Sequence, residues 1–72
     1  MLVNVYGTVL NVHTGVSKSS GKSFRMADIY DGEDLLKIFS VPDEIVQGEV
    51  VNIRCRLSVD NNKLFLSFKE LA

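Results

Sequence analysis

The chain is poor in the residues that usually stabilise or activate a domain of its size. Its 72 residues include one cysteine, one histidine, one proline and no tryptophan. A single cysteine cannot form an intramolecular disulfide. Cys55 and His13 together are also too few for a zinc site, which needs three or four protein ligands. We therefore expect neither a disulfide framework nor a bound metal.

The sequence also contains few candidate catalytic residues. The cysteine falls on the inward parity of a predicted strand, where it is most simply a small core residue, so no pair of nucleophile and base is evident. The carboxylates cluster in predicted turns, where solvation explains them better than acid-base catalysis does. "SSGKS" lacks the earlier glycine of a phosphate-binding loop. We predict a protein that is not an enzyme and has neither catalytic residues nor a cofactor.

Long hydrophobic runs are absent too. No stretch approaches the roughly 18 uninterrupted apolar residues of a membrane span, and no basic segment precedes the apolar start of the chain. We expect no membrane partner and no signal peptide. An unpaired cysteine suits a reducing compartment, so the predicted location is the cytoplasm.

The length of the chain predicts one domain over residues 1–72. A domain this short buries only roughly 60% of the surface that its unfolded form exposes. Small domains often gain stability from disulfides, a metal or a partner subunit. Since the first two are not expected, we predict a homodimer.

Charge is segregated along the sequence although the net charge is only −1. Residues 13–25 contain two lysines and an arginine and no acid, whereas residues 28–49 contain seven acids and only one base, Lys37. From residue 50 onward bases outnumber acids again. One surface of the folded protein could therefore be positive while another is negative.

Apolar residues recur with period 2 along most of the chain, which indicates half-buried strands. "YDGED" and "DNN" are turn signals, and "PDEIVQGE" allows at most one helical turn before Gly48. The predicted strands are 2–12, 23–31, 35–41, 50–59 and 63–71. This pattern favours an all-β fold, a small five-stranded antiparallel OB-like barrel, with an SH3-like barrel as the alternative.

The parity of these strands places aromatic and basic side chains together on the outer surface. Single-stranded nucleic acid is bound by such a combination, because bases stack on flat rings while cations neutralise phosphates. The second and third strands also form the customary binding surface of OB folds. The predicted outer set is Tyr6, Phe24, Met26, Asp28, Tyr30, Lys37, Phe39, Arg54 and Arg56.

A loop over residues 12–24, "VHTGVSKSSGKSF", adds to this surface. It is free of acids and longer than the other predicted turns, and Phe24 and Arg25 stand at its end. A mobile basic arm with Lys18 and Lys22 could close over a nucleic-acid strand and release it as salt competes.

The same residues allow a different interpretation. Phe39, with Leu35 and Val41 near it, could belong to a second core or a dimer contact, and Phe65 could serve an interface in the same way. The protein would then be an OB-like protein-interaction module. Single-stranded RNA is a further alternative ligand, which sequence does not separate from DNA.

Several stretches together resemble a known family. "GVSKSSGKSF", "LLKIF" and the closing "LSVDNNKLFLSFKELA" are similar to the DNA-binding wing, third strand and final hairpin of the gene V type single-stranded-DNA-binding proteins of filamentous phages. The resemblance implies an OB-like barrel, a two-fold dimer and cooperative coating of single-stranded DNA during replication. By position it implies binding roles for Lys18, Phe24, Met26, Tyr30 and Lys37.

The sequence departs from this family in two places. The "DNN" turn lacks the aromatic residue that some relatives carry there, and Lys69 stands where the phage prototype has a pair of arginines. Arg54 and Arg56 could compensate. The predicted function is binding of single-stranded DNA without strong sequence preference, in phage or mobile-element replication. The predicted nucleic-acid-binding residues are Lys18, Lys22, Phe24, Arg25, Met26, Tyr30, Lys37, Arg54 and Arg56.

Overall fold

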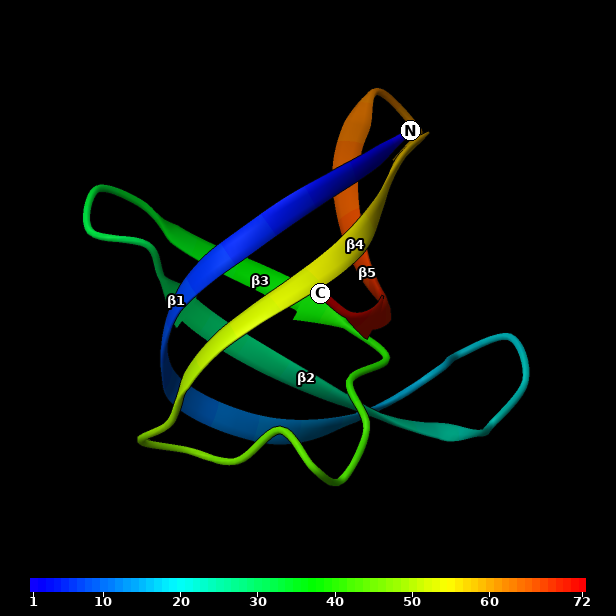
Figure 1. Ribbon diagram of the computed structural model, residues 1–72. Helices are drawn as coiled ribbons and strands as arrows, with labels where there is room; N and C mark the ends of the chain where they lie inside the picture. The colour runs from blue at the N-terminus through cyan, green and yellow to red at the C-terminus, as the bar shows by residue number, and fades with distance from the viewer.

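A computed structural model describes all 72 residues as five strands in a single sheet that closes on itself (Figure 1). Their bounds lie close to the predicted ones, apart from the end of the first strand. The strands are β1 (Leu2–Val16), β2 (Ser23–Tyr30), β3 (Leu35–Phe39), β4 (Val50–Asp60) and β5 (Lys63–Leu71). No helix is long and apolar enough to cross a membrane.

Around the barrel the strand order is β1-β2-β3-β5-β4, and β1 also pairs with β4. The predicted all-β, five-stranded, OB-like barrel is confirmed. The prediction that every pairing is antiparallel is wrong, because β3 and β5 run parallel. The other pairings explain this direction. Two antiparallel steps, from β1 to β2 and from β2 to β3, make β3 run in the direction of β1. Two antiparallel steps, from β1 to β4 and from β4 to β5, make β5 run in that direction too.

The strand β1 closes the barrel by pairing with two neighbours in turn. Its first half, up to Thr8, pairs with β4, and its second half pairs with β2 as far as Val16. At the crossover Gly7 lies against the Tyr30 carbonyl so closely that no Cβ would fit. A register shift follows between Val9 and Asn11. The predicted end of this strand at residue 12 is therefore too early, and the predicted long loop is a hairpin with a short tip.

The core follows the predicted alternation in the middle of each strand. Fully buried side chains come from β1, β2, β3 and β4, and Leu66 and Phe68 of β5 pack against them. Cys55 is fully buried, which confirms its prediction as a core residue, and desolvation raises the pKa of its thiol to about 11. The side chains with no exposed surface are Val9, Ala27, Ile29, Ile38, Ile53 and Cys55.

The alternation fails where a strand leaves the barrel wall. Strict alternation along the predicted strand 35–41 puts Val41 on the same face as Phe39, but Ser40 adopts a φ of 60° and Val41 lies in the core, where it is 4% exposed. Alternation along β4 and β5 also puts Val59 and Leu64 on the inward face, yet they are 66% and 69% exposed. They lie beside the tight turn of the β4–β5 hairpin, which extends past the core.

The β3–β4 connection closes one end of the barrel without a helix (Figure 1). Val41 and Ile45 place buried side chains there. The backbone of Val9 is tied to this connection by hydrogen bonds with Gly48 and Glu49, both 2.8 Å long. The sequence prediction of at most one turn between Pro42 and Gly48 is confirmed.

Candidate functional site

Three phenylalanines form a row on the outer surface of the barrel. Phe24 of β2, Phe39 of β3 and Phe65 of β5 are all partly exposed. The ring centroids of Phe24 and Phe39 are 6.1 Å apart, and those of Phe39 and Phe65 are 5.7 Å apart. The planes are tilted by 50° and 60°, so the rings are inclined to one another rather than stacked in parallel. We call these three residues the phenylalanine row.

Strand register brings the row together. Met26 lies opposite Phe39, so Phe24 is diagonal to Phe39 across β2 and β3. Ser67 lies opposite Phe39 on the other side, so Phe65 is diagonal to Phe39 across β3 and β5. Because side chains alternate along a strand, positions two residues apart share a face. The parallel pairing of β3 and β5 thus places residues 24, 39 and 65 on one surface.

A glycine in β1 leaves room for the first ring of the row. Gly15 lies opposite Phe24 on the neighbouring strand. A Cβ at this position would come within 2.9 Å of Cζ of Phe24 and 3.0 Å of Cε of Met26. The side chains of Phe24 and Met26 therefore both reach over Gly15, which places Met26 beside the first ring of the row.

A pocket of about 500 Å³ opens on the row and has a polar rim. Its apolar lining is the phenylalanine row itself, and its remaining lining residues are Ser17, Ser58, Asp60 and Ser67. Ser17 stands at the base of the β1–β2 hairpin tip, and Ser58 and Asp60 come from the end of β4. This volume is in the range of small-molecule sites. We call this space the row pocket.

A second hollow, of about 520 Å³, adjoins Phe39 and Phe65 and is nearly all apolar. Lys37 is its one polar lining residue, and Phe24 does not reach it. We call it the leucine groove. Phe39 and Phe65 thus border two hollows of different character, whereas Phe24 borders only the row pocket. The leucines that line the groove are Leu35, Leu36, Leu57, Leu64 and Leu66.

The predicted basic loop is the tip of the β1–β2 hairpin, which projects away from the barrel (Figure 1). Ser17 N–H donates to the Lys22 carbonyl over 2.9 Å, and Gly21 N–H donates to the Ser17 carbonyl over 2.8 Å. Gly21 has a φ of 71°, which closes the turn. Lys18 and Lys22 are exposed in this tip and make no ion pair. Both lysines are close to Ser17 of the row pocket along the backbone, since Lys18 follows it in sequence and the Lys22 carbonyl accepts its N–H.

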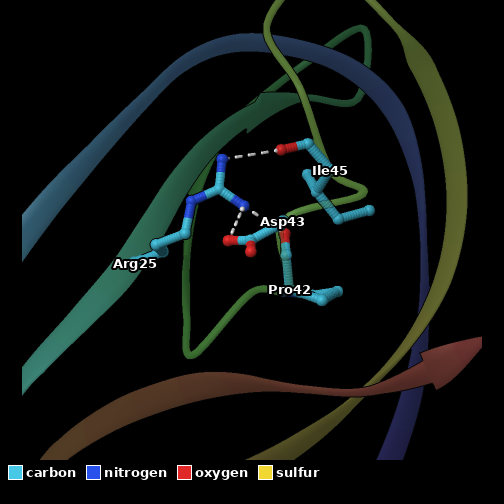
Figure 2. A network of polar contacts seen from close by, with 4 residues as sticks. All are labelled: Arg25, Pro42, Asp43 and Ile45. Carbon is cyan, nitrogen blue, oxygen red and sulfur yellow. Dashed lines mark hydrogen bonds and ion pairs between the residues drawn. The ribbon is translucent and has the colours of Figure 1, made fainter.

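Arg25 is used within the fold (Figure 2). Its guanidinium donates to the Pro42 carbonyl and, over 3.1 Å, to the Ile45 carbonyl, and Asp43 lies 3.5 Å away. These partners belong to the β3–β4 connection, and only 27% of the side chain is exposed. The structure therefore does not bring Arg25 to the phenylalanine row, although it follows Phe24 in sequence.

The other predicted cations differ in whether an acidic residue lies beside them. Lys37 lies directly opposite Asp28 across β2 and β3, which gives Asp28 a neighbour of opposite charge. Arg54 lies 3.5 Å from Glu70. Arg56 makes no ion pair and lies opposite Ser67, so it is the cation of β4 nearest to the row pocket by register.

Tyr30 lies apart from the row at the far end of β2. Its hydroxyl donates to the Gly32 carbonyl over 2.9 Å, and its ring lines neither hollow. In the same turn the Asp31 carboxylate accepts hydrogen bonds from the backbone N–H groups of Asp34 and Glu33, which lower its pKa. The polar contacts of Tyr30 and Asp31 are thus made within the β2–β3 turn.

Sequence reasoning did not include Phe39, Phe65 or the polar rim among the binding residues. Outward parity already put both phenylalanines on the surface. The missing information was that β3 and β5 are neighbours, since only this pairing makes Phe65 part of the same surface as Phe24. The serines and Asp60 carry no signal in sequence, because such residues are common in loops and strand ends.

Comparisons with protein-family models, with curated proteins and with solved structures find no match to this chain. The function must therefore be argued from the geometry of the row and its surroundings.

Proposed function

We propose that the protein binds single-stranded nucleic acid, with single-stranded DNA as the ligand, across the phenylalanine row. The observation that carries the proposal is the row itself: three neighbouring aromatic rings from β2, β3 and β5 on the outside of an OB-like barrel. Rings buried in a core would be unavailable, but these border an open pocket. Stacking of a base on such a ring contributes roughly 1 to 3 kcal/mol and is tolerant of sequence.

Free cations beside the row supply the second part of this chemistry. Lys18 and Lys22 stand in the hairpin tip, and Arg56 lies in β4 next to Ser67. They can neutralise phosphates on either side of stacked bases. The acids concentrated in the β2–β3 turn and the β3–β4 connection lie on other parts of the chain.

The resemblance of the hairpin tip to the wing of gene V type proteins favours DNA and a role in replication of a phage or mobile element. A homodimer stays a prediction from the small size of the chain, and sedimentation at several protein concentrations measures it. RNA stays the alternative ligand, so both polymers belong in the binding experiment.

The test is titration of a fluorescent oligonucleotide of mixed sequence, with DNA, RNA and duplex forms compared across a salt series. We expect the single-stranded form to bind, with log K falling by roughly 0.7 per log unit of salt for each phosphate neutralised. Phe24→Ala should weaken binding by about tenfold through loss of one stacking surface, and should leave the salt slope nearly unchanged.

Tyr6→Ala is the matched control for Phe24→Ala. Tyr6 is 65% exposed on the first half of β1 and lines neither hollow, so its loss should leave affinity unchanged. Failure of the folded wild-type protein to bind any single strand at low salt would contradict the proposal.

Phe24 also separates this function from that of a protein-interaction module. The leucine groove favours the second function, since it is apolar and open at the surface. Phe39 borders both hollows, so its substitution would impair either function. Phe24 borders only the row pocket. A protein-interaction module would therefore tolerate Phe24→Ala.

A further inference from the structure

An acid in the rim of the row pocket has no evident use in a site for a polyanion. Asp60 is the last residue of β4 and lines the pocket beside the phenylalanine row. It takes part in neither of the two ion pairs of the protein, although Lys63 lies opposite it in register. The residue is exposed, and its carboxylate makes neither a hydrogen bond nor an ion pair within the protein.

The chemistry of a carboxylate restricts what Asp60 can contact in a nucleotide. Its oxygens only accept hydrogen bonds, so they repel phosphates and require N–H groups of a base. Guanine carries two adjacent donors, N1–H and the 2-amino group, on its Watson–Crick edge. Adenine and cytosine offer one amino group beside an acceptor, and thymine offers one N–H between two carbonyls. Guanine alone can make a two-point contact with a carboxylate.

The rest of the rim complements the same edge. Asp60 and three serines line the same pocket as the phenylalanine row, so the edge of a base stacked on a ring would meet these polar groups. Ser58 lies two residues before Asp60 on the same face of β4, and both residues line the pocket. A hydroxyl can donate to O6 of guanine. The phenylalanine rings could thus stack on the face of a guanine base, while the Asp60 carboxylate and a serine hydroxyl could bind its Watson–Crick edge.

We propose that the row pocket prefers guanine, with the Asp60 carboxylate accepting from N1–H and the 2-amino group and a rim serine donating to O6. This inference rests on the proposed function and adds a base preference at one position to otherwise sequence-tolerant binding. The phosphates would then contact unpaired cations such as Lys22 and Arg56 rather than Asp60.

The test uses short oligothymidylates that carry one central deoxyguanosine, one central deoxyinosine or only thymidine. One guanine per strand keeps quadruplexes out of the experiment. We expect the deoxyguanosine strand to bind about tenfold more tightly than the all-thymidine strand, near the lower end of what a two-point contact to a base edge gives. Inosine lacks the 2-amino group, so its strand should fall between the two.

Asp60→Asn keeps the size of the side chain but replaces one of the two acceptor oxygens with an amide NH₂ group, which only donates. The variant therefore cannot accept two hydrogen bonds from guanine side by side. We expect the guanine-to-thymine affinity ratio to fall close to one, because the deoxyguanosine strand loses its two-point contact and binds more weakly, while the all-thymidine strand binds somewhat more tightly for loss of a negative charge. Glu33→Gln in the β2–β3 turn is the matched control, since it removes the same charge outside the pocket. Its ratio should stay at the wild-type value.

The outcomes separate this inference from the proposed function. Equal binding of the three strands by the wild-type protein would overturn the guanine preference and leave single-strand binding in place. An unchanged ratio in a folded Asp60→Asn variant would overturn the role of Asp60. Absence of binding to every strand would overturn both proposals.

Discussion

Phe24 and Arg25 are neighbours in the sequence, but their side chains serve different regions of the molecule. Phe24 lies in the phenylalanine row, which opens on a pocket with a polar rim. Arg25 points to the closed end of the barrel, where two carbonyls of the β3–β4 connection and Asp43 surround its guanidinium. One strand thus supplies a ring to the open face and a cation to the closed end.

The comparison teaches that residue type alone does not show which side chains are available to a ligand. From residue type alone, Arg25 would be expected to contact a phosphate and Phe24 would be expected in the hydrophobic core. In the fold the arginine donates to two backbone carbonyls of the β3–β4 connection, while the phenylalanine stays partly exposed because its strand face points outward. Each of the following substitutions tests one side of this contrast.

The largest effect is expected from Arg25→Ala, and it should be on stability. Removal of the guanidinium leaves the Pro42 and Ile45 carbonyls without their charged donor and loosens the connection that holds Val41 and Ile45 in the core. We expect the free energy of unfolding to fall by about 2 kcal/mol. Denaturation in urea measures the loss, and the salt slope of binding should not change.

Asp43→Ala is the matched comparison at the same site. Asp43 lies 3.5 Å from the guanidinium but is 99% exposed, so its removal should cost no more than about 0.5 kcal/mol. A folded and fully stable Arg25→Ala variant with a reduced salt slope would instead make Arg25 a phosphate contact, as its place in the sequence suggests.

Much of the fold follows from the sequence because alternation and turn residues act locally. The five strands, the "DNN" turn with positive φ at Asn61 and Asn62, and the burial of Cys55 were all predictable. The direction of β5 relative to β3 was not, because a pairing between segments far apart in the chain leaves no local signal. The burial of Val41 was not predictable either, because the positive φ of Ser40 interrupts the alternation and places the Val41 side chain in the core.

The candidate site was only partly predictable for the same reason. Phe24 and the lysines of the hairpin tip could be recognised from ring and charge in one stretch. Phe65 could not be joined to them without the β3–β5 pairing. The use of Arg25 inside the fold was also hidden, because its acceptors are backbone carbonyls of the β3–β4 connection, which every residue carries.

A smaller effect, on binding alone, is expected from Gly15→Ala. The new Cβ would lie 2.9 Å from the end of the Phe24 ring, and that ring can rotate away more easily than backbone can move. The barrel should stay folded while the ring loses its place in the row. We expect affinity for a single strand to fall by about threefold to tenfold, which is part of the contribution of one stacking contact.

A double-mutant cycle shows whether Gly15 acts through Phe24. In a Phe24→Ala background there is no ring for the new methyl group to displace, so Gly15→Ala should have no further effect on affinity. Additive losses would mean that Gly15 contributes to binding independently of the ring.

The smallest effect is expected from Lys22→Ala, and it sharpens the contrast between free and engaged cations. Lys22 makes no ion pair in the hairpin tip, whereas Arg54 already lies 3.5 Å from Glu70. Loss of one phosphate contact should reduce the magnitude of the salt slope by roughly 0.7. The turn should persist, because Lys22 contributes only its backbone carbonyl to the contact with Ser17.

Arg54→Ala is the matched variant for this last measurement. Its guanidinium would have to leave Glu70 before it could meet a phosphate, so its removal should change the slope less than Lys22→Ala does. The two slopes are read from titrations of the same oligonucleotide between low and moderate salt. Equal reductions would mean that Arg54 binds a phosphate as readily as Lys22 does, despite its exposed ion pair with Glu70. Among the predicted cations, only Arg25 would then be kept from the ligand by its contacts, which are with backbone carbonyls of the β3–β4 connection.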